Sequence, residues 1–386
     1  MSPGVPHKPL AIVLIVLAFP FILLSANITI AKQLEWRAPP PKKAGPAKLE
    51  LGITRLREQG FSILKGKRVG LLAQAASVDE RGISTVELLA QAPGVHLVAL
   101  FAPEHGLRGE FNSNEAFSST VDQHLQIPIY SLYEGSRWPT PPMLEQVDIM
   151  VIDLQDIGSR SYTYISAMKY TMQACFKKKI PVVVLDRPNP LGGLKVEGPI
   201  LQKKYQSYVG TFRIPYVHGL TIGELAKMAV DDIPEKGTIY VVRMSGWHRN
   251  MVWQDTGLKW HATSGAVPTV ESVYGYACTG LGAQLGAFHH GIGTPYPFSF
   301  LTHPRLSPLE LRQRLEKERL RGFSYDILRI PQRPGKACQE GVHVTVTDWS
   351  QAEPMALNLL MLQIDLENWG PEGLQLCNQI EPNLVQ

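Results

Sequence analysis

The sequence lacks the short motifs that mark the commonest nucleotide, metal and serine-hydrolase sites. No GxGxxG follows the first strand-like run, and GxxxxGK[ST] and GxSxG are absent, which argues against dinucleotide-binding, P-loop and α/β-hydrolase proteins. HEXXH is missing as well, and the adjacent His289 and His290 have no third ligand at a metal-binding spacing. We therefore predict no metal and no cofactor.

Cysteine is scarce, and the chain has no CxxC pair. The four cysteines are scattered at Cys175, Cys278, Cys338 and Cys377. Zinc binding by cysteine is therefore unexpected. A Cys338–Cys377 disulfide in an oxidising compartment and buried free thiols both fit this spacing.

An excess of basic charge is missing from the body of the chain. The formal net charge is +4, but residues 1–48 alone carry +5, which leaves −1 for the remainder. A nucleic-acid-binding domain normally carries a basic patch. We therefore predict no nucleic-acid partner.

The N-terminal segment contains one long uncharged, apolar run, from Leu10 to Ala31. This run predicts that residues 1–31 are a signal peptide or an uncleaved N-terminal anchor. Residues 32–48 are rich in proline and basic groups and predict a linker. We expect an exported protein, periplasmic or secreted if the segment is cleaved and held at the inner membrane by residues 10–31 if it is not.

The body alternates short apolar runs with helical patterns. The apolar runs lie at 68–73, 96–102, 127–133, 148–154 and 180–186, and a helical pattern covers 165–179. Near-continuous apolar strands between helices indicate a parallel sheet covered on both faces. We predict an α/β fold: a Rossmann-like parallel-sheet domain over 49–235 and a smaller α+β domain over 236–386.

Ionisable and polar residues come directly after the predicted strands. They are Glu104, His105, Asp153, Asp156, Arg160, Tyr162, Tyr164, Asp186, Arg187 and Asn189. The opposite strand ends carry little comparable chemistry. Because open α/β sheets bind ligands beyond the carboxyl ends of their strands, this pattern predicts an active-site cleft.

Single residues in this group allow more than one interpretation. Asp153 and Asp186 end apolar strands, where a carboxylate must be paired or hydrogen-bonded, and a structural role is as compatible as a catalytic one. Glu104 follows a proline and precedes a glycine-containing turn that can present it to a cleft, where a half-desolvated carboxyl group could act as a general acid. Tyr162 and Tyr164 could hold a sugar or pack in the core.

Four ordered motifs carry a family resemblance. They are FAPEHGLRG, VDIMVIDLQDIGSRSYTY, VVVLDRPNPLGG with VEGP, and VGTFRIPYVHGLTIGELA. Together, over about residues 50–260, they resemble the exo-β-N-acetylmuramidase family NamZ. The resemblance implies a Rossmann-like domain, a smaller second domain and release of terminal N-acetylmuramic acid from peptidoglycan fragments.

The resemblance also implies roles for particular residues. Glu104 becomes the leading candidate for the catalytic acid. The residues that it implies line or brace the site are Asp153, Gln155, Asp156, Arg160, Tyr162, Tyr164, Asp186, Arg187, Asn189 and His218, and we add His105 to the candidates for substrate binding.

Glycoside hydrolysis needs a second group at the anomeric centre. Asp153, Asp156, Glu224 and the substrate's own acetamido oxygen are the alternatives, of which we favour Asp156. Glu224 is discounted because it is the N3 residue of a capping box that starts at Thr221.

The second half departs from the family pattern. Residues 282–294 contain no Glu, Asn or Arg, although the resemblance leads us to expect all three there. An anchored protein that binds wall glycan without cleaving it is therefore the alternative to an enzyme.

Overall fold

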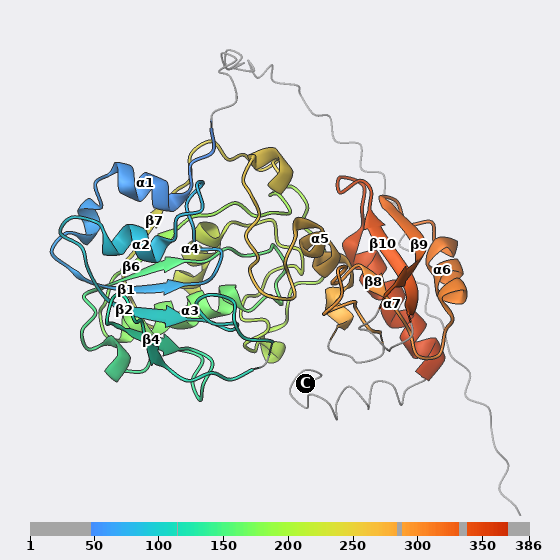
Figure 1. Ribbon diagram of the computed structural model, residues 1–386, viewed down its shortest axis with the longest axis horizontal. Helices are drawn as coiled ribbons and strands as arrows, with labels where there is room; N and C mark the ends of the chain where they lie inside the picture. Colours follow the sequence, from blue (N-terminus) through green and yellow to red (C-terminus); the bar gives the residue numbers. More distant parts are fainter. Residues whose placement is uncertain (1–47, 114, 284–287, 332–337, 370–386) are drawn as a thin grey trace, which may run out of the picture. The chain divides into compact units, whose positions relative to one another are not determined.

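The larger sheet contains seven strands in the order β3-β4-β2-β1-β5-β6-β7 (Figure 1). Its parallel strands are β1 (Arg68–Ala73), β2 (His96–Ala102), β4 (Pro128–Ser131), β5 (Ile149–Asp153), β6 (Val182–Leu185) and β7 (Ile239–Val242). Strand β3 (Thr120–Val121) pairs antiparallel at one edge. The parallel strands have the Rossmann order, in which the direction of winding reverses between β1 and β5. The predicted Rossmann-like sheet is confirmed.

The computed structural model describes residues 48–113, 115–283, 288–331 and 338–369. All of them belong to one compact unit, Pro46–Gln386. The predicted leader, most of the predicted linker and Cys377 lie outside the described residues. Among the described residues, none of the helices combines the length and the apolar character that a membrane span requires.

Helices cover both faces of the larger sheet. They are α1 (Gly52–Glu58), α2 (Thr85–Ala90), α3 (Tyr164–Lys177) and α4 (Ile222–Asp232). Leu71 of β1 shares a core with α1 and α2, whereas its neighbour Leu72 shares a second core with α3 and α4. Successive strand residues point to opposite faces, so both must be apolar when both faces are covered.

A smaller antiparallel sheet has the order β8-β10-β9. Its strands are β8 (Phe300–Leu301), β9 (Phe323–Ile330) and β10 (Gln339–Val346), accompanied by α5 (Val270–Thr279), α6 (Pro308–Lys317) and α7 (Pro354–Trp369). Leu311, Val342 and Leu357 join helices and sheet in one core. The expected α/β fold with a smaller α+β part is therefore present.

Short 3-10 helices connect these elements, at Ser62–Leu64, Pro142–Leu144, Lys203–Tyr205, Trp253–Thr256 and Gly280–Gly282. Strand β7 pairs with β6, so the larger sheet includes residues beyond the boundary that we placed near 235. The division into domains at that position stays a prediction.

Candidate active site

The turn after β2 buries Glu104. His105 and Gly106 both have positive φ angles, 72° and 80°. A Cβ atom at Gly106 would come within 2.7 Å of the Phe111 ring, so only glycine fits there. His105 Nδ1 lies 3.0 Å from the Phe111 carbonyl and must donate to it. The closed turn leaves Glu104 only 6% exposed.

Hydroxyl groups surround the Glu104 carboxyl group. Thr163, the N-cap residue of α3, donates from Oγ1 to Glu104 Oε2 over 2.7 Å. Burial, followed by the nearby Glu104, raises the pKa of Tyr133, and the same two causes raise the pKa of Tyr208. Both tyrosines therefore keep their protons and are potential hydrogen-bond donors beside the carboxyl group.

Arg137 completes this side of the site. Its Cζ lies 3.3 Å from the Tyr133 ring centroid, a cation–π contact. Arg137 Nη1 and Tyr208 Oη are buried and have no hydrogen-bond partner among the described residues. Buried polar atoms are rarely left unpaired, so these two atoms point to a ligand or water near the Tyr133 and Tyr208 rings.

Asp156 lies just beyond the carboxyl end of β5 and is 4% exposed. Its Oδ2 accepts from the Gly158 N–H over 2.8 Å and lies 3.2 Å from His218 Nε2 without a well-aligned hydrogen bond. His218 Nδ1 accepts from the Leu220 N–H, so the ring proton of a neutral His218 is on Nε2, facing Asp156. Asp156 Oδ1 is buried and has no partner in the described part of the chain.

The charges of both carboxyl groups act on Tyr276 of α5. Burial raises its pKa to about 12, and Glu104 and Asp156 both add to this rise. Its hydroxyl lies 3.0 Å from Ser161 Oγ. Glu104 and Asp156 thus both influence a hydroxyl group that comes from the second half of the chain.

Asp153 and Arg187 form a buried ion pair. Arg187 donates from Nε to Asp153 Oδ1 over 2.5 Å and from Nη2 to Oδ2 over 2.8 Å. Thr85 also donates to Asp153 Oδ2, and Arg187 Nη2 donates to the Val78 carbonyl over 2.8 Å. With these groups paired, the arrangement braces the ends of β5 and β6.

Three further candidates bond mainly to the backbone. Asp186 Oδ1 accepts from the Gly223 N–H over 2.8 Å at the start of α4, and burial raises the pKa of Asp186. Asn189 bonds the Leu220 carbonyl and the Leu191 N–H. Arg160 Nη1 donates to the Pro199 and Ile214 carbonyls over 2.7 and 2.6 Å. These contacts fix loops around the site, and a role in substrate binding stays a prediction for all three.

Tyr162 and Tyr164 attach the segment around Thr263 to α3. The Tyr162 hydroxyl donates to Thr263 Oγ1 over 2.7 Å, and the Tyr164 hydroxyl donates to the Thr263 carbonyl over 2.6 Å. Burial raises the pKa of both tyrosines, so both remain donors. Their hydroxyls thus position a segment from the second half of the chain.

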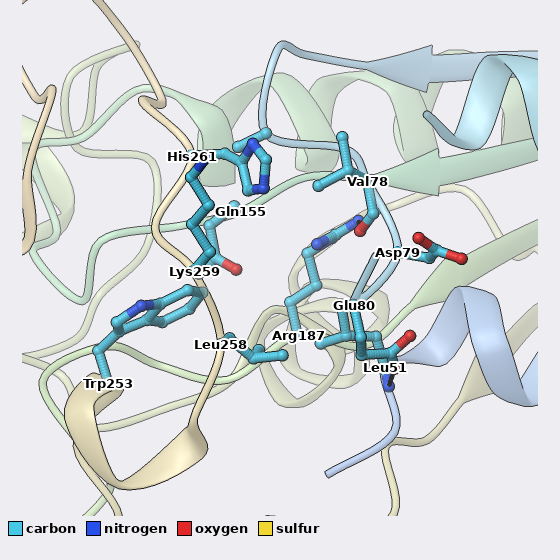
Figure 2. A pocket seen from close by; sticks show the side chains of 11 residues that line it. Leu51, Val78, Asp79, Glu80, Gln155, Arg187, Trp253, Leu258, Lys259 and His261 are labelled. Atoms are coloured by element: carbon cyan, nitrogen blue, oxygen red, sulfur yellow. Dashed lines mark hydrogen bonds between the residues drawn. The ribbon is translucent and has the colours of Figure 1, made fainter. Parts of the chain in front are cut away.

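A pocket lies beyond the ends of β1, β5 and β6 (Figure 2). Gln155 and Arg187 line it together with Asp79, Lys259 and His261. Gln155 Nε2 donates to the Asp156 and Pro188 carbonyls, while its Oε1 is buried and has no partner among the described residues. Glu104 and Asp156 do not line this pocket. We place the chemistry at these two carboxyl groups, and we regard the pocket as a neighbouring feature.

Sequence reasoning missed several residues near Glu104. Tyr133 ends the apolar run 127–133, and Thr163 lies between two candidate tyrosines, so the strand-end pattern could have found both. Arg137 also follows the apolar run 127–133, in the segment EGSR, but we did not select it as a candidate; Tyr208 and Tyr276 gave no comparable signal. No group of three or more His, Cys, Asp or Glu residues able to hold a metal occurs in the described ranges.

A doubly wound sheet with two buried carboxyl groups beyond its carboxyl edge defines an α/β protein equipped for acid–base chemistry. Comparison with known proteins identifies the family. The chain matches the N-terminal model of exo-beta-N-acetylmuramidase NamZ over residues 69–271 and the C-terminal model over 274–375. It belongs to this family, and the match continues well past residue 260, where the sequence motifs ended.

Relatives and solved structures agree with this assignment. Peptidoglycan beta-N-acetylmuramidase NamZ of Bacillus subtilis (strain 168) is 39% identical over 322 residues, which cover 82% of this chain and 77% of the relative. A crystal structure of a DUF1343 family protein from Bacteroides fragilis NCTC 9343 is 36% identical, with a TM-score of 0.77 over 88% of this chain and 87% of its own. A second DUF1343 protein from that organism, 23% identical, has a TM-score of 0.62 over 88% and 99% of the two chains and shares the fold.

Proposed function

We propose that this protein is an exported glycosidase that releases terminal N-acetylmuramic acid from the non-reducing end of peptidoglycan fragments. Membership of the exo-beta-N-acetylmuramidase family supports the reaction and the substrate class. The observation that carries the assignment of the acid is the burial of Glu104 beyond the end of β2, where Thr163 donates to it.

Glu104 is the general acid of this proposal. It protonates the leaving glycosidic oxygen, a step that general acids accelerate by about 10²- to 10⁴-fold. Thr163 and Tyr133 hold the carboxyl group in place. Arg137 Nη1 and Tyr208 Oη are then available to the sugar's polar groups.

Asp156 acts at the anomeric centre. Its Oδ2 is fixed by Gly158 and faces His218, while Oδ1 has no partner in the described part of the chain. That oxygen orients a water molecule or the substrate's acetamido group. A buried polar atom without a partner calls for a ligand or a water molecule, and this supports the role of Oδ1.

The uncharged run from Leu10 to Ala31 supports export. Retained, the segment anchors the protein at the inner membrane; cleaved, it releases the protein to the periplasm or medium. Cell fractionation together with N-terminal sequencing of the recovered protein distinguishes these outcomes, and a protein found only in the cytoplasm would contradict export.

The test of the enzyme uses the full chain, purified in detergent because of its apolar N-terminal run. It is offered a chromogenic β-N-acetylmuramide and the disaccharide MurNAc-GlcNAc. Glu104→Gln should lower the rate on the disaccharide at least about 10²-fold, because the amide cannot donate a carboxyl proton. Glu318→Gln, an exposed carboxylate of the α6 C-cap, is the matched control and should keep the wild-type rate.

Three results would overturn parts of the proposal. Wild type that binds the disaccharide but releases nothing is a glycan-binding protein. A disaccharide rate that survives Glu104→Gln removes the general-acid role. Loss of activity with EDTA, restored by a divalent cation, assigns the chemistry to a metal.

A further inference from the structure

A surface hollow lies beside α3, away from the residues of the candidate site. It encloses about 290 Å³ and is lined by Trp138, Pro141, Leu144, Tyr170, Lys177 and Lys178, among others. Trp138 is 51% exposed, and its ring lies 5.9 Å from that of Tyr170 at an interplanar angle of 72°. Ligand sites are typically concave and lined by aromatic side chains with a few polar groups, and this hollow has both features.

Aromatic contacts connect this hollow to Glu104. The Tyr170 ring lies 5.7 Å from Tyr208, and Tyr208 lies 6.3 Å from Tyr133. Tyr133 and Tyr208 are the tyrosines whose pKa values Glu104 raises. Successive ring contacts thus lead from Tyr170, which lines the hollow, to the tyrosines near Glu104.

Helix α3 sets the distance between the two places. Thr163 at its start contacts Glu104, whereas Tyr170 and Lys177 lie seven and fourteen residues further on. At about 1.5 Å per residue, these positions are about 10 and 21 Å along the helix. A few linked sugar rings span such a distance.

The charge around the hollow suits an acidic saccharide. Lys177 and Lys178 are exposed at the end of α3, and Lys177 also forms a 3.6 Å ion pair with Glu235. Muramic acid carries a lactyl carboxylate, and peptide stems add further carboxylates. Flat aromatic faces pack against the apolar face of a pyranose ring, as they do against other ring systems.

We propose that this hollow is an outer glycan subsite, in which Trp138 and Tyr170 hold a sugar of the strand beyond the reaction site and Lys177 and Lys178 attract its carboxylates. The inference rests on the proposed function. The outer subsite predicts that the protein prefers glycan strands to disaccharides. The residues around Glu104 alone do not predict this preference.

The test compares a short and a long substrate. For Trp138→Ala, we expect KM on peptide-free glycan strands to rise about tenfold, while kcat and KM on the chromogenic β-N-acetylmuramide stay unchanged. Trp138→Phe should bring KM on the strands most of the way back to the wild-type value, because phenylalanine also presents a flat ring. The matched control is Tyr240→Ala, which removes an aromatic residue of edge strand β7 that is 46% exposed. This variant should leave kcat and KM unchanged on both substrates.

A binding experiment separates this inference from the proposed function. In the Glu104→Gln background, Trp138→Ala should weaken calorimetric binding of the strands about tenfold, whether or not the parent protein is an enzyme. The subsite would be overturned if Trp138→Ala left both the binding of the strands and the KM on the strands unchanged. A Trp138→Ala variant that alters only the sedimentation of the protein would instead identify a contact between copies and would overturn it as well.

Discussion

Among single residues, Asp153 and Arg187 show how a strand end can carry charge without exposing it. Both side chains are at most 3% exposed, and two direct hydrogen bonds join them. Little of their hydrogen-bonding capacity therefore remains for a substrate. A buried ion pair adds little net stability, but removing one partner leaves an uncompensated charge in the core.

Replacing Arg187 alone should therefore be costly. We expect Arg187→Met to lower the free energy of unfolding by about 3–5 kcal/mol in urea titrations, and Asp153→Leu added to Arg187→Met to recover part of that loss. The exposed pair Arg329–Glu340 provides the comparison: Arg329→Met should cost at most about 1 kcal/mol. Similar losses for Arg187→Met and Arg329→Met would show that burial is not decisive.

The sequence located the candidate residues better than it assigned their individual tasks. The carboxyl ends of parallel strands meet at one edge of a sheet, so Glu104 and Asp156 could be placed near each other from the strand pattern. Whether Asp186 or Asn189 faces a ligand or a helix end depends on loop paths, which the strand pattern does not contain. Tyr276 could not be anticipated because only tertiary packing brings α5 to the carboxyl groups.

At the scale of elements, strong local signals were reliable and weak ones were not. The apolar runs became β1, β2, β4, β5 and β6, and the capping box at Thr221 begins α4. The structure has a further capping box at Ser307, which begins α6. Helix α5 was missed because it contains β-branched and aromatic residues and Gly275. A Cβ atom at Gly275 would come within 2.7 Å of the Phe298 carbonyl, so packing rather than helix propensity determines this element.

An ion pair between Arg68, the first residue of β1, and Asp148, just before β5, makes the free energy of unfolding depend on pH. Hydrogen bonds from the Arg68 side chain and backbone lower the pKa of Asp148 from 3.8 to about 2. A lowered folded-state pKa stabilises the fold above the unfolded-state pKa, near 4, and this contribution is lost as the pH falls towards 2.

Asp148→Asn removes this contribution. Because the pair is exposed, we expect a loss of at most about 1 kcal/mol at pH 7. The difference between wild type and variant, measured by urea unfolding, should shrink to near zero as the pH falls from about 4 to about 2. A difference that stays constant over this range would rule out Asp148 as the titrating group.

At the scale of the whole described unit, the core of the larger sheet extends to α5 and α7 of the second half of the chain, whereas the smaller sheet has a core of its own and meets the first through Val346 of β10. Met150 and Val184 of the larger sheet belong to the same cluster as Val273, Phe298 and Met355. Hydrogen bonds add to this connection: Trp349 Nε1 donates to the Leu191 carbonyl over 2.9 Å, and Lys195 Nζ donates to the Ala352 carbonyl over 2.6 Å.

A core that extends into both halves of the chain predicts cooperative unfolding. We expect one calorimetric transition whose van't Hoff enthalpy equals the calorimetric enthalpy. Phe298→Ala should shift that single transition to lower temperature without splitting it, because a cavity in this core weakens both parts. Two resolved transitions in wild type would mean that the sheets unfold independently.

Helix α3 also restricts how relatives of this protein can vary in length. It carries Thr163 at one end and Lys177 at the other without interruption. Deleting or inserting one residue would turn everything beyond it by about 100° and shift it by about 1.5 Å. Insertions and deletions within the family should therefore fall in the loops that flank α3, while the number of residues between Thr163 and Lys177 stays fixed.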